Sequence, residues 1–273
     1  MKRMEALTTF NIMKTKIGFI GCGNMGQAIL KGVVKDSSIL VAEKDASRVA
    51  LLKKKYKVAC ADVPTVVKKS NIIILAVKPQ DFGQILDEIK GSLTKNHLVI
   101  SIAAGITCSY IEERLGDVRV VRTMPNLPAQ VGVGMTALCK GKFAKDNDVK
   151  QSQRIFDAIG KTVIVDEKWM NAVTAVSGSG PAYVFLFVEC MMNAAKALGF
   201  PDDVSKDLVY QTLKGSVKLL EESSDGAETL RLKVTSKGGT TEAAIKEFFG
   251  AKLDEIFKTA LKAAETRARE LAK

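Results

Sequence analysis

Short runs of apolar, mostly β-branched residues alternate with helix-like stretches in the first part of the chain. Five such runs predict strands, at residues 16–21, 39–43, 71–77, 97–102 and 118–122. Apolar positions at helical spacing predict helices between them, at 25–35, 46–55 and 82–89. The strands are continuously apolar instead of alternating, which is typical of a parallel sheet covered on both faces. The pattern therefore predicts a doubly wound α/β domain.

The pattern changes after Asp166, where strand-like runs stop. Residues 181–199 are apolar on nearly every side, which predicts a helix buried on several sides. Helical spacing continues through 204–220 and 253–271. We therefore predict an α/β domain over residues 14–166 and an all-helical domain over 167–273, preceded by a frayed extension over residues 1–13.

Charge and composition exclude several classes of function. The 273 residues carry a net charge of +11, and the whole excess lies in residues 1–166. Apart from Lys53–Lys55 and Lys68–Lys69 these basic residues are scattered singly, and no aromatic platform is interleaved with the two runs, so we expect no nucleic-acid partner. No apolar run approaches the roughly 18 residues of a membrane helix, so we expect no membrane span.

Cysteine and histidine usage bears on metals and on the compartment. The five cysteines form no CxxC pair and no ligand spacing, which is typical of buried, reduced thiols in a cytoplasmic protein. His97 is the single histidine, so a His-rich metal site is excluded and we expect no metal.

The first chemical motif is Gly21-Cys22-Gly23-Asn24-Met25-Gly26, between the first predicted strand and the first helix. Gly21 permits a tight turn, Gly23 lets the backbone approach a pyrophosphate, and Gly26 lets the helix pack close to the strand. The free N–H groups at the helix start attract phosphates. This context predicts dinucleotide binding in a Rossmann-type domain.

In Rossmann domains the residues at the end of the second strand determine the preference for NADH or NADPH. Glu43 stands where an acidic side chain accepts the ribose hydroxyls of NAD and repels a 2′-phosphate. Lys44 follows directly and Arg48 lies one turn later, and these cations can hold a phosphate. The choice between NADH and NADPH stays open.

Two further loops follow predicted strands at the edge where doubly wound sheets bind ligands. They are AVKPQ, residues 76–80, and RTMPNLPA, residues 122–129. Asn126 in the second loop can hydrogen-bond a nicotinamide carboxamide, or it can cap its own turn.

The helical part holds two clusters of small residues. SGSGPAY, residues 177–183, suits a packed helix start, because proline in a first turn costs no hydrogen bond. TSKGGTT, residues 235–241, combines hydroxyl groups, flexible glycine backbone and a helix start, which suits a carboxylate site. The alternative is plain N-capping by Thr240 or Thr241.

GCGNMG, AVKPQ, MPNLPA, SGSGPAY and TSKGGTT occur in this order from Lys14 to the C-terminus. In this the chain resembles the pyrroline-5-carboxylate reductase family. The resemblance implies reduction of 1-pyrroline-5-carboxylate to L-proline by NADPH or NADH. It also implies a Rossmann domain and a helical domain that forms a homodimer, which often assembles further.

The resemblance also implies roles for particular residues. The pyrophosphate would be bound by Gly21, Gly23, Asn24, Met25 and Gly26, and the ribose and nicotinamide by Ala76, Lys78 and Pro79, with Asn126 nearby. The substrate carboxylate would be bound by Ser236, Gly239, Thr240 and Thr241. Two residues depart from the family pattern, since Lys237 replaces a usual proline and Leu127 a frequent threonine.

Reduction of a cyclic imine requires few catalytic groups from the protein. A protonated cyclic imine accepts hydride without a metal or a nucleophile, so catalysis is mainly a matter of proximity. Thr174 is the candidate for a hydrogen bond near the imine nitrogen. The alternative is a packed threonine whose hydroxyl bonds to its own helix.

Two other functions share parts of this pattern. A 3-hydroxy-acid dehydrogenase needs a general base such as a lysine, but Lys196 lies about four turns beyond Gly180. A non-catalytic sensor of dinucleotide redox state would have no use for a second ligand site. The loop over residues 235–241, which we call the carboxylate loop, therefore argues against a sensor.

Overall fold

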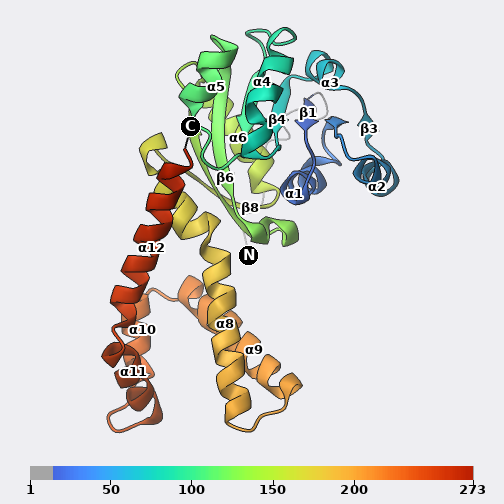
Figure 1. The fold of residues 1–273 in the computed structure, drawn as a ribbon. Helices are drawn as coiled ribbons and strands as arrows, with labels where there is room; N and C mark the ends of the chain where they lie inside the picture. The colour runs from blue at the N-terminus through green and yellow to red at the C-terminus, as the bar shows by residue number, and fades with distance from the viewer. Residues whose placement is uncertain (1–14, 273) are drawn as a thin grey trace. The chain divides into compact units, whose positions relative to one another are not determined.

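The computed structural model describes residues 15–272, which divide into two compact units. The first unit holds residues 15–179 together with 264–272, and the second holds residues 180–263 (Figure 1). The extension expected at residues 1–13 lies outside the described residues. The domain boundary at Asp166 stays a prediction, because the units are divided by spatial contact and separate after Ser179.

An eight-stranded sheet organises the first unit, in the order β3-β2-β1-β4-β5-β6-β7-β8. Neighbouring strands are parallel except for β6 and β7, which are antiparallel. The order 3-2-1-4-5-6 is that of the Rossmann fold, whose ligand crevice lies where the strand order reverses, between β1 and β4. The strands are β1 (Lys16–Ile20), β2 (Ser38–Ala42), β3 (Ala59–Cys60), β4 (Ile72–Leu75), β5 (Leu98–Ser101), β6 (Arg119–Pro125), β7 (Gly134–Lys140) and β8 (Gly160–Ile164).

Helices cover both faces of this sheet. One apolar cluster contains Phe19, Ile29 and Phe156, and the other contains Leu75, Leu86 and Ile111. Successive residues of β1, β4 and β5 alternate between the two clusters, as the pleat of a strand requires. The helices are α1 (Asn24–Val33), α2 (Ala46–Tyr56), α3 (Val63–Lys69), α4 (Phe82–Lys90), α5 (Cys108–Leu115), α6 (Asp146–Asp157) and α7 (Met170–Val173). The predicted doubly wound α/β architecture is confirmed.

The second unit is entirely helical in secondary structure, as predicted. It contains α8 (Gly180–Ala197), α9 (Asp202–Glu222), α10 (Ala227–Lys233), α11 (Thr240–Gly250) and the first part of α12 (Leu253–Glu270). Helices α8 and α9 pack against each other. Only Ser205 and Val209 are buried within residues 180–263. This unit therefore has almost no core of its own.

The expected burial of the helix over 181–199 is wrong for the single chain. None of the residues of α8 is buried, and the side chains of Phe185 and Leu186 are 57% and 60% exposed. The apolar pattern correctly predicts a helix, but packing against α9 leaves most of its large apolar side chains exposed in the single chain.

One described helical stretch meets the length and composition of a membrane-crossing helix, which corrects the expectation that none would. It spans residues 167–197, has a mean hydropathy of 1.3, and has 11% of its most apolar window buried. A helix that packs against a second protein chain meets the same test.

A cavity of about 530 Å³ opens at the amino ends of β1, β4, β5 and β6. Thr15, Asn71, Asn96 and Arg119 are among its lining residues. This edge is opposite the carboxyl ends of the strands, where ligands bind in doubly wound sheets, so the cavity is not the predicted cofactor site.

Candidate active site

The glycine-rich turn lies between β1 and α1, at the point where the strand order reverses. Gly21 has a φ of +77°, and a Cβ placed there would lie 2.9 Å from the carbonyl oxygen of Ala76. A Cβ on Gly23 would meet no atom within 4 Å, so the space beside it is open. A Cβ on Gly26 would lie 3.4 Å from that of Ala76, which shows how closely the helix approaches the sheet. The structure thus gives the three glycines the local conformations that the motif predicts.

The start of α1 can receive an anion. Gly23 is its N-cap, and the amide of Gln27 is the one that bonds back to the carbonyl of Gly23. The amides of Asn24, Met25 and Gly26 therefore have no carbonyl partner within the helix. The first turn carries no acidic residue, and the helix dipole adds partial positive charge there.

Glu43 has partners that sequence reasoning missed. Its Oε2 accepts hydrogen bonds from the backbone N–H of Cys22 (2.9 Å) and from Arg48 Nη1 (3.1 Å), and its Oε1 accepts from the N–H of Asp45 (3.0 Å). The side chain is only 3% exposed. The carboxylate thus holds the glycine-rich turn and, together with Asp45, pairs with Arg48, and its contact with a ribose stays a prediction.

The neighbouring cofactor candidates are more exposed. Lys44 Nζ lies 3.2 Å from a carboxylate oxygen of Asp81, in an ion pair open to solvent. Lys78 precedes a short 3₁₀ helix, Pro79–Asp81, and both Lys78 and Pro79 are exposed. Burial raises the pKa of the Cys22 thiol in the turn to about 12, so this thiol is not a nucleophile.

Asn126 bridges two segments instead of capping its own turn. Its Nδ2 donates to the backbone oxygen of Ser177 at 3.2 Å and approaches the hydroxyl of Ser177 at 3.3 Å. Its Oδ1 accepts from the N–H of Met135 at 2.8 Å. The side chain therefore ties the loop after β6 to the SGSG segment, and a contact with nicotinamide stays a prediction.

The Thr174 hydroxyl hydrogen-bonds within its own helix, which is the alternative to a contact with the imine nitrogen. Its hydroxyl donates to the backbone oxygen of Met170 at 2.8 Å. The residue begins a π-helical turn, Thr174–Gly178, a feature that often occurs at functional sites. The hydroxyl oxygen retains a lone pair, so a role near the imine nitrogen stays a prediction.

The carboxylate loop belongs to the second unit. Gly238 has a φ of +72°, and Gly239 is the N-cap of α11, with no side chain bonding to the free amides. Thr240 and Thr241 are the first two residues of the helix, so neither caps it, contrary to the alternative. The carboxylate of Glu242 accepts from the N–H of Gly238 at 2.8 Å. Two hydroxyls and the first amides of an eleven-residue helix are therefore left for a ligand.

The structure shows that His97, the only histidine, is structural. Its ring nitrogens lie 3.2 Å from the backbone oxygen of Val67 and 3.0 Å from the hydroxyl of Thr94. The thiols only partly follow the prediction of burial. Cys22, Cys108 and Cys139 are buried, Cys60 is half-buried, and Cys190 is exposed on α8.

Comparisons with known proteins agree with this geometry. A family model described as pyrroline-5-carboxylate reductase dimerisation matches residues 167–271, and one described as NADP oxidoreductase, coenzyme F420-dependent, matches residues 16–105. The pyrroline-5-carboxylate reductase of Synechocystis sp. is 36% identical over 267 residues, which cover 96% of this chain and 100% of that protein. The chain belongs to the pyrroline-5-carboxylate reductase family.

Solved structures of this family have the same fold. A pyrroline-5-carboxylate reductase from Coxiella burnetii superimposes with a TM-score of 0.88 at 36% identity, covering 95% of this chain and 99% of that one. Pyrroline carboxylate reductase from Plasmodium falciparum, solved with NADP bound, superimposes with a TM-score of 0.86 at 30% identity, covering 96% and 99%.

Membership of the pyrroline-5-carboxylate reductase family confirms the predicted fold class and the nicotinamide class of cofactor. It also supports a homo-oligomer, because the dimerisation model covers the helices that lack a core. Lys196, considered for the rival 3-hydroxy-acid dehydrogenase, lies at the far end of α8 and forms an exposed ion pair with Asp202 at 2.9 Å. The roles of individual residues remain predictions.

Proposed function

We propose that this chain reduces 1-pyrroline-5-carboxylate to L-proline with NADPH or NADH, as the last step of proline synthesis. The observation that carries the proposal is the similarity to named reductases along almost the entire chain. Two local features support it, a glycine-rich turn before an uncapped helix start in the first unit and a second uncapped helix start in the second.

The glycine-rich turn would bind the dinucleotide through backbone amides. The open space beside Gly23 and the unpaired amides at the start of α1 suit a pyrophosphate. Ala76, Lys78 and Pro79 follow the adjacent strand β4, at the same edge of the sheet. The nicotinamide cofactor supplies a hydride when it is bound.

The loop before α11 would bind the substrate carboxylate. Ser236, Gly239, Thr240 and Thr241 offer hydroxyls and amides, and the helix dipole favours an anion there. Lys237 is exposed beside the loop and adds a positive charge. Anchoring the carboxylate orients the ring, so that its imine carbon can lie roughly 3–3.5 Å from the hydride donor.

The reaction would need no covalent catalysis. The C=N bond gains a hydride at carbon, and the nitrogen takes its proton from solvent. Thr174 is the proposed partner of that nitrogen, with its hydroxyl proton directed to Met170 and its oxygen free to accept. Residues that position the two reactants would then supply most of the rate enhancement.

We also propose a homodimer formed through the C-terminal helices, which can assemble further, in the cytoplasm and without nucleic-acid, membrane or metal partners in the reduction. The exposed apolar surface of α8 supports the dimer, because a second copy would cover it.

The direct test is oxidation of NADPH and of NADH by the purified protein, with pyrroline-5-carboxylate, with a 3-hydroxy acid plus oxidised cofactor, and with neither. Turnover with pyrroline-5-carboxylate alone is expected. Turnover of the hydroxy acid would indicate the rival dehydrogenase, and cofactor binding without any turnover would indicate a sensor.

A further inference from the structure

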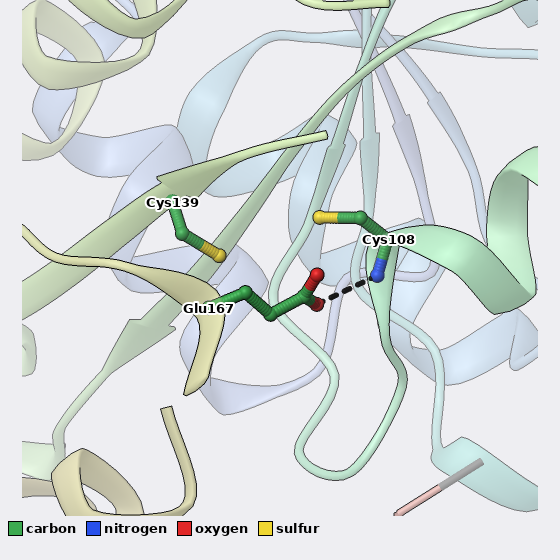
Figure 2. Close-up of side chains that lie close together, drawn as sticks. All are labelled: Cys108, Cys139 and Glu167. Carbon is green, nitrogen blue, oxygen red and sulfur yellow. Dashed lines mark hydrogen bonds between the residues drawn. The ribbon is translucent and has the colours of Figure 1, made fainter. Parts of the chain in front are cut away.

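Two thiols and a carboxylate from three separate segments converge within the first unit (Figure 2). Cys108 opens α5, Cys139 lies on β7, and Glu167 begins a 3₁₀ helix, Glu167–Trp169, after β8. The two sulfurs and a carboxylate oxygen all lie within 4.8 Å of one another, and both cysteines are buried. The proposed reduction makes no use of this cluster.

The carboxylate of Glu167 is held in place through one of its two oxygens. Its Oε1 accepts hydrogen bonds from the backbone N–H of Cys108 (2.8 Å) and from Arg122 Nη1 (3.0 Å). In Figure 2 the other oxygen points toward the two sulfurs. Outer hydrogen bonds of this kind orient the carboxylates that bind metals and leave one oxygen for the ion.

Two thiolate sulfurs and one carboxylate oxygen are a donor set that suits Zn²⁺. Tetrahedral bonds of about 2.3 Å to sulfur and 2.0–2.2 Å to oxygen place ligand atoms about 3.5–4 Å apart. The three side chains therefore need to close by about 1 Å or less. We propose that Cys108, Cys139 and Glu167 form a binding site for a thiophilic divalent cation such as Zn²⁺.

Charge balance permits such an ion in a buried place. Without metal, the ion pair of Glu167 and Arg122 has no net charge. Binding releases the two thiol protons to solvent and forms two metal–sulfur bonds. Two thiolates, one carboxylate, one guanidinium and one divalent cation again sum to zero, so no uncompensated charge is buried.

A carboxylate oxygen one turn after Cys108 lacks a partner among the described residues. Oε1 of Glu112, one turn along α5, is buried and makes no hydrogen bond among the described residues. A Cβ at Gly141 would collide with this oxygen and would lie 3.3 Å from Cβ of Cys108, so the absence of a side chain keeps that space open. A water in the fourth zinc position would be a donor for such an oxygen.

The test is metal binding by the full chain, stripped with a chelator and kept reduced. Titration with Cd²⁺ or Co²⁺ should give thiolate-to-metal charge-transfer absorbance that saturates at one ion per chain. Cys108→Ser and Cys139→Ser should each abolish this absorbance, and Glu167→Gln should weaken binding about ten- to a hundredfold. Cys190→Ser and Cys60→Ser, which remove thiols outside the cluster, should bind as the unchanged protein does.

A measurement on the unchanged protein covers the case in which a variant does not fold. X-ray absorption at the zinc edge should show two sulfur neighbours per bound zinc. A zinc site with only nitrogen and oxygen neighbours overturns the proposal. So does a fully reduced protein that takes up no metal, or equal binding by the folded Cys108→Ser and Cys139→Ser variants.

Discussion

The carboxylate of Glu43 lies 2.9 Å from the backbone nitrogen of Cys22 and so fastens the glycine-rich turn to the end of β2. Because the same Oε2 also accepts from Arg48, the residue that discriminates between cofactors in the prediction is part of the turn's own structure. The predicted determinant of cofactor preference is therefore also a structural support of the glycine-rich turn.

Replacing Glu43 should shift preference toward NADPH. Glu43→Ser removes a negative charge from the predicted ribose site and one of the two carboxylate partners of Arg48, the other being Asp45, so the ratio of kcat/KM for NADPH to that for NADH should rise about tenfold. Steady-state kinetics with both cofactors measure the ratio. Arg48→Ala in the Glu43→Ser background should cancel the gain, and an unchanged ratio would mean that Glu43 does not face the ribose.

The two glycines of the turn should respond differently to substitution. Gly23→Val places a side chain in open space, so the protein should stay folded and lose cofactor affinity. Gly21→Val forces a β-branched residue to a positive φ and toward the carbonyl of Ala76, and should cost at least about 1–3 kcal/mol of stability. Cofactor titration and thermal unfolding separate the two effects. Undiminished cofactor binding by folded Gly23→Val would contradict the assignment.

Asn126 should matter for stability as well as for activity. Asn126→Ala leaves the N–H of Met135 and the carbonyl of Ser177 without a partner, at a cost of about 1–3 kcal/mol. Denaturant unfolding measures the loss. If Asn126→Ala unfolds like the unchanged protein but loses affinity for the nicotinamide cofactor, the side chain is a binding residue and not a bridge.

The exposed face of α8 should be an interface between subunits. Leu186→Glu puts a charge on a surface that a second copy would bury, so the oligomer should dissociate at micromolar concentration. Light scattering measures the mass. Leu51→Glu, at a side chain 43% exposed on α2, is the matched control and should leave the mass unchanged. A wild-type protein that is monomeric under these conditions would refute the interface.

Thr241 should bind the substrate carboxylate. Thr241→Ala removes one hydrogen bond to a charged group, worth about 1.5–3 kcal/mol, so kcat/KM for pyrroline-5-carboxylate should fall roughly ten- to a hundredfold. Thr241→Val keeps the shape and should behave in the same way, with cofactor affinity unchanged in both variants.

Stability distinguishes this role from a structural one. Because Gly239 caps α11, neither variant of Thr241 should lower the melting temperature appreciably. Thr235→Val, whose native hydroxyl bonds to the carbonyl of Arg231, is the control for a threonine engaged within the fold. A Thr241→Ala protein that melts earlier yet keeps its KM would place the carboxylate elsewhere.

Sequence patterns predicted the elements that bury long, continuous apolar runs. They missed β3, which has two residues, and β8, whose residues are mostly exposed and which therefore lacks a buried strand's pattern. They also missed β7 (GMTALCK), which lacks a β-branched run, the short helices α3, α5, α7 and α10, and the longer helix α6. The antiparallel pairing of β7 with β6 is a contact between strands, and the periodicity within each strand does not encode it.

The candidate site shows the same division. The conformations of Gly21 and Gly23 follow from local turn geometry and were predictable from the motif. The partners of Asn126 and Glu43, and the cluster of Cys108 with Cys139 and Glu167, join residues far apart in the chain. Such contacts arise only when the sheet has assembled, so spacing along the sequence carries no sign of them.

The last turns of α12 complete the first unit, although they follow the whole helical unit in the sequence. Gly105, at a φ of +73°, accommodates them, because a Cβ there would lie 2.7 Å from the carbonyl oxygen of Leu271. During translation the surface around Gly105 therefore stays uncovered until the helical unit and the end of α12 have been synthesised. A shortened gene that ends after residue 179 would encode a sheet domain that never receives its final segment.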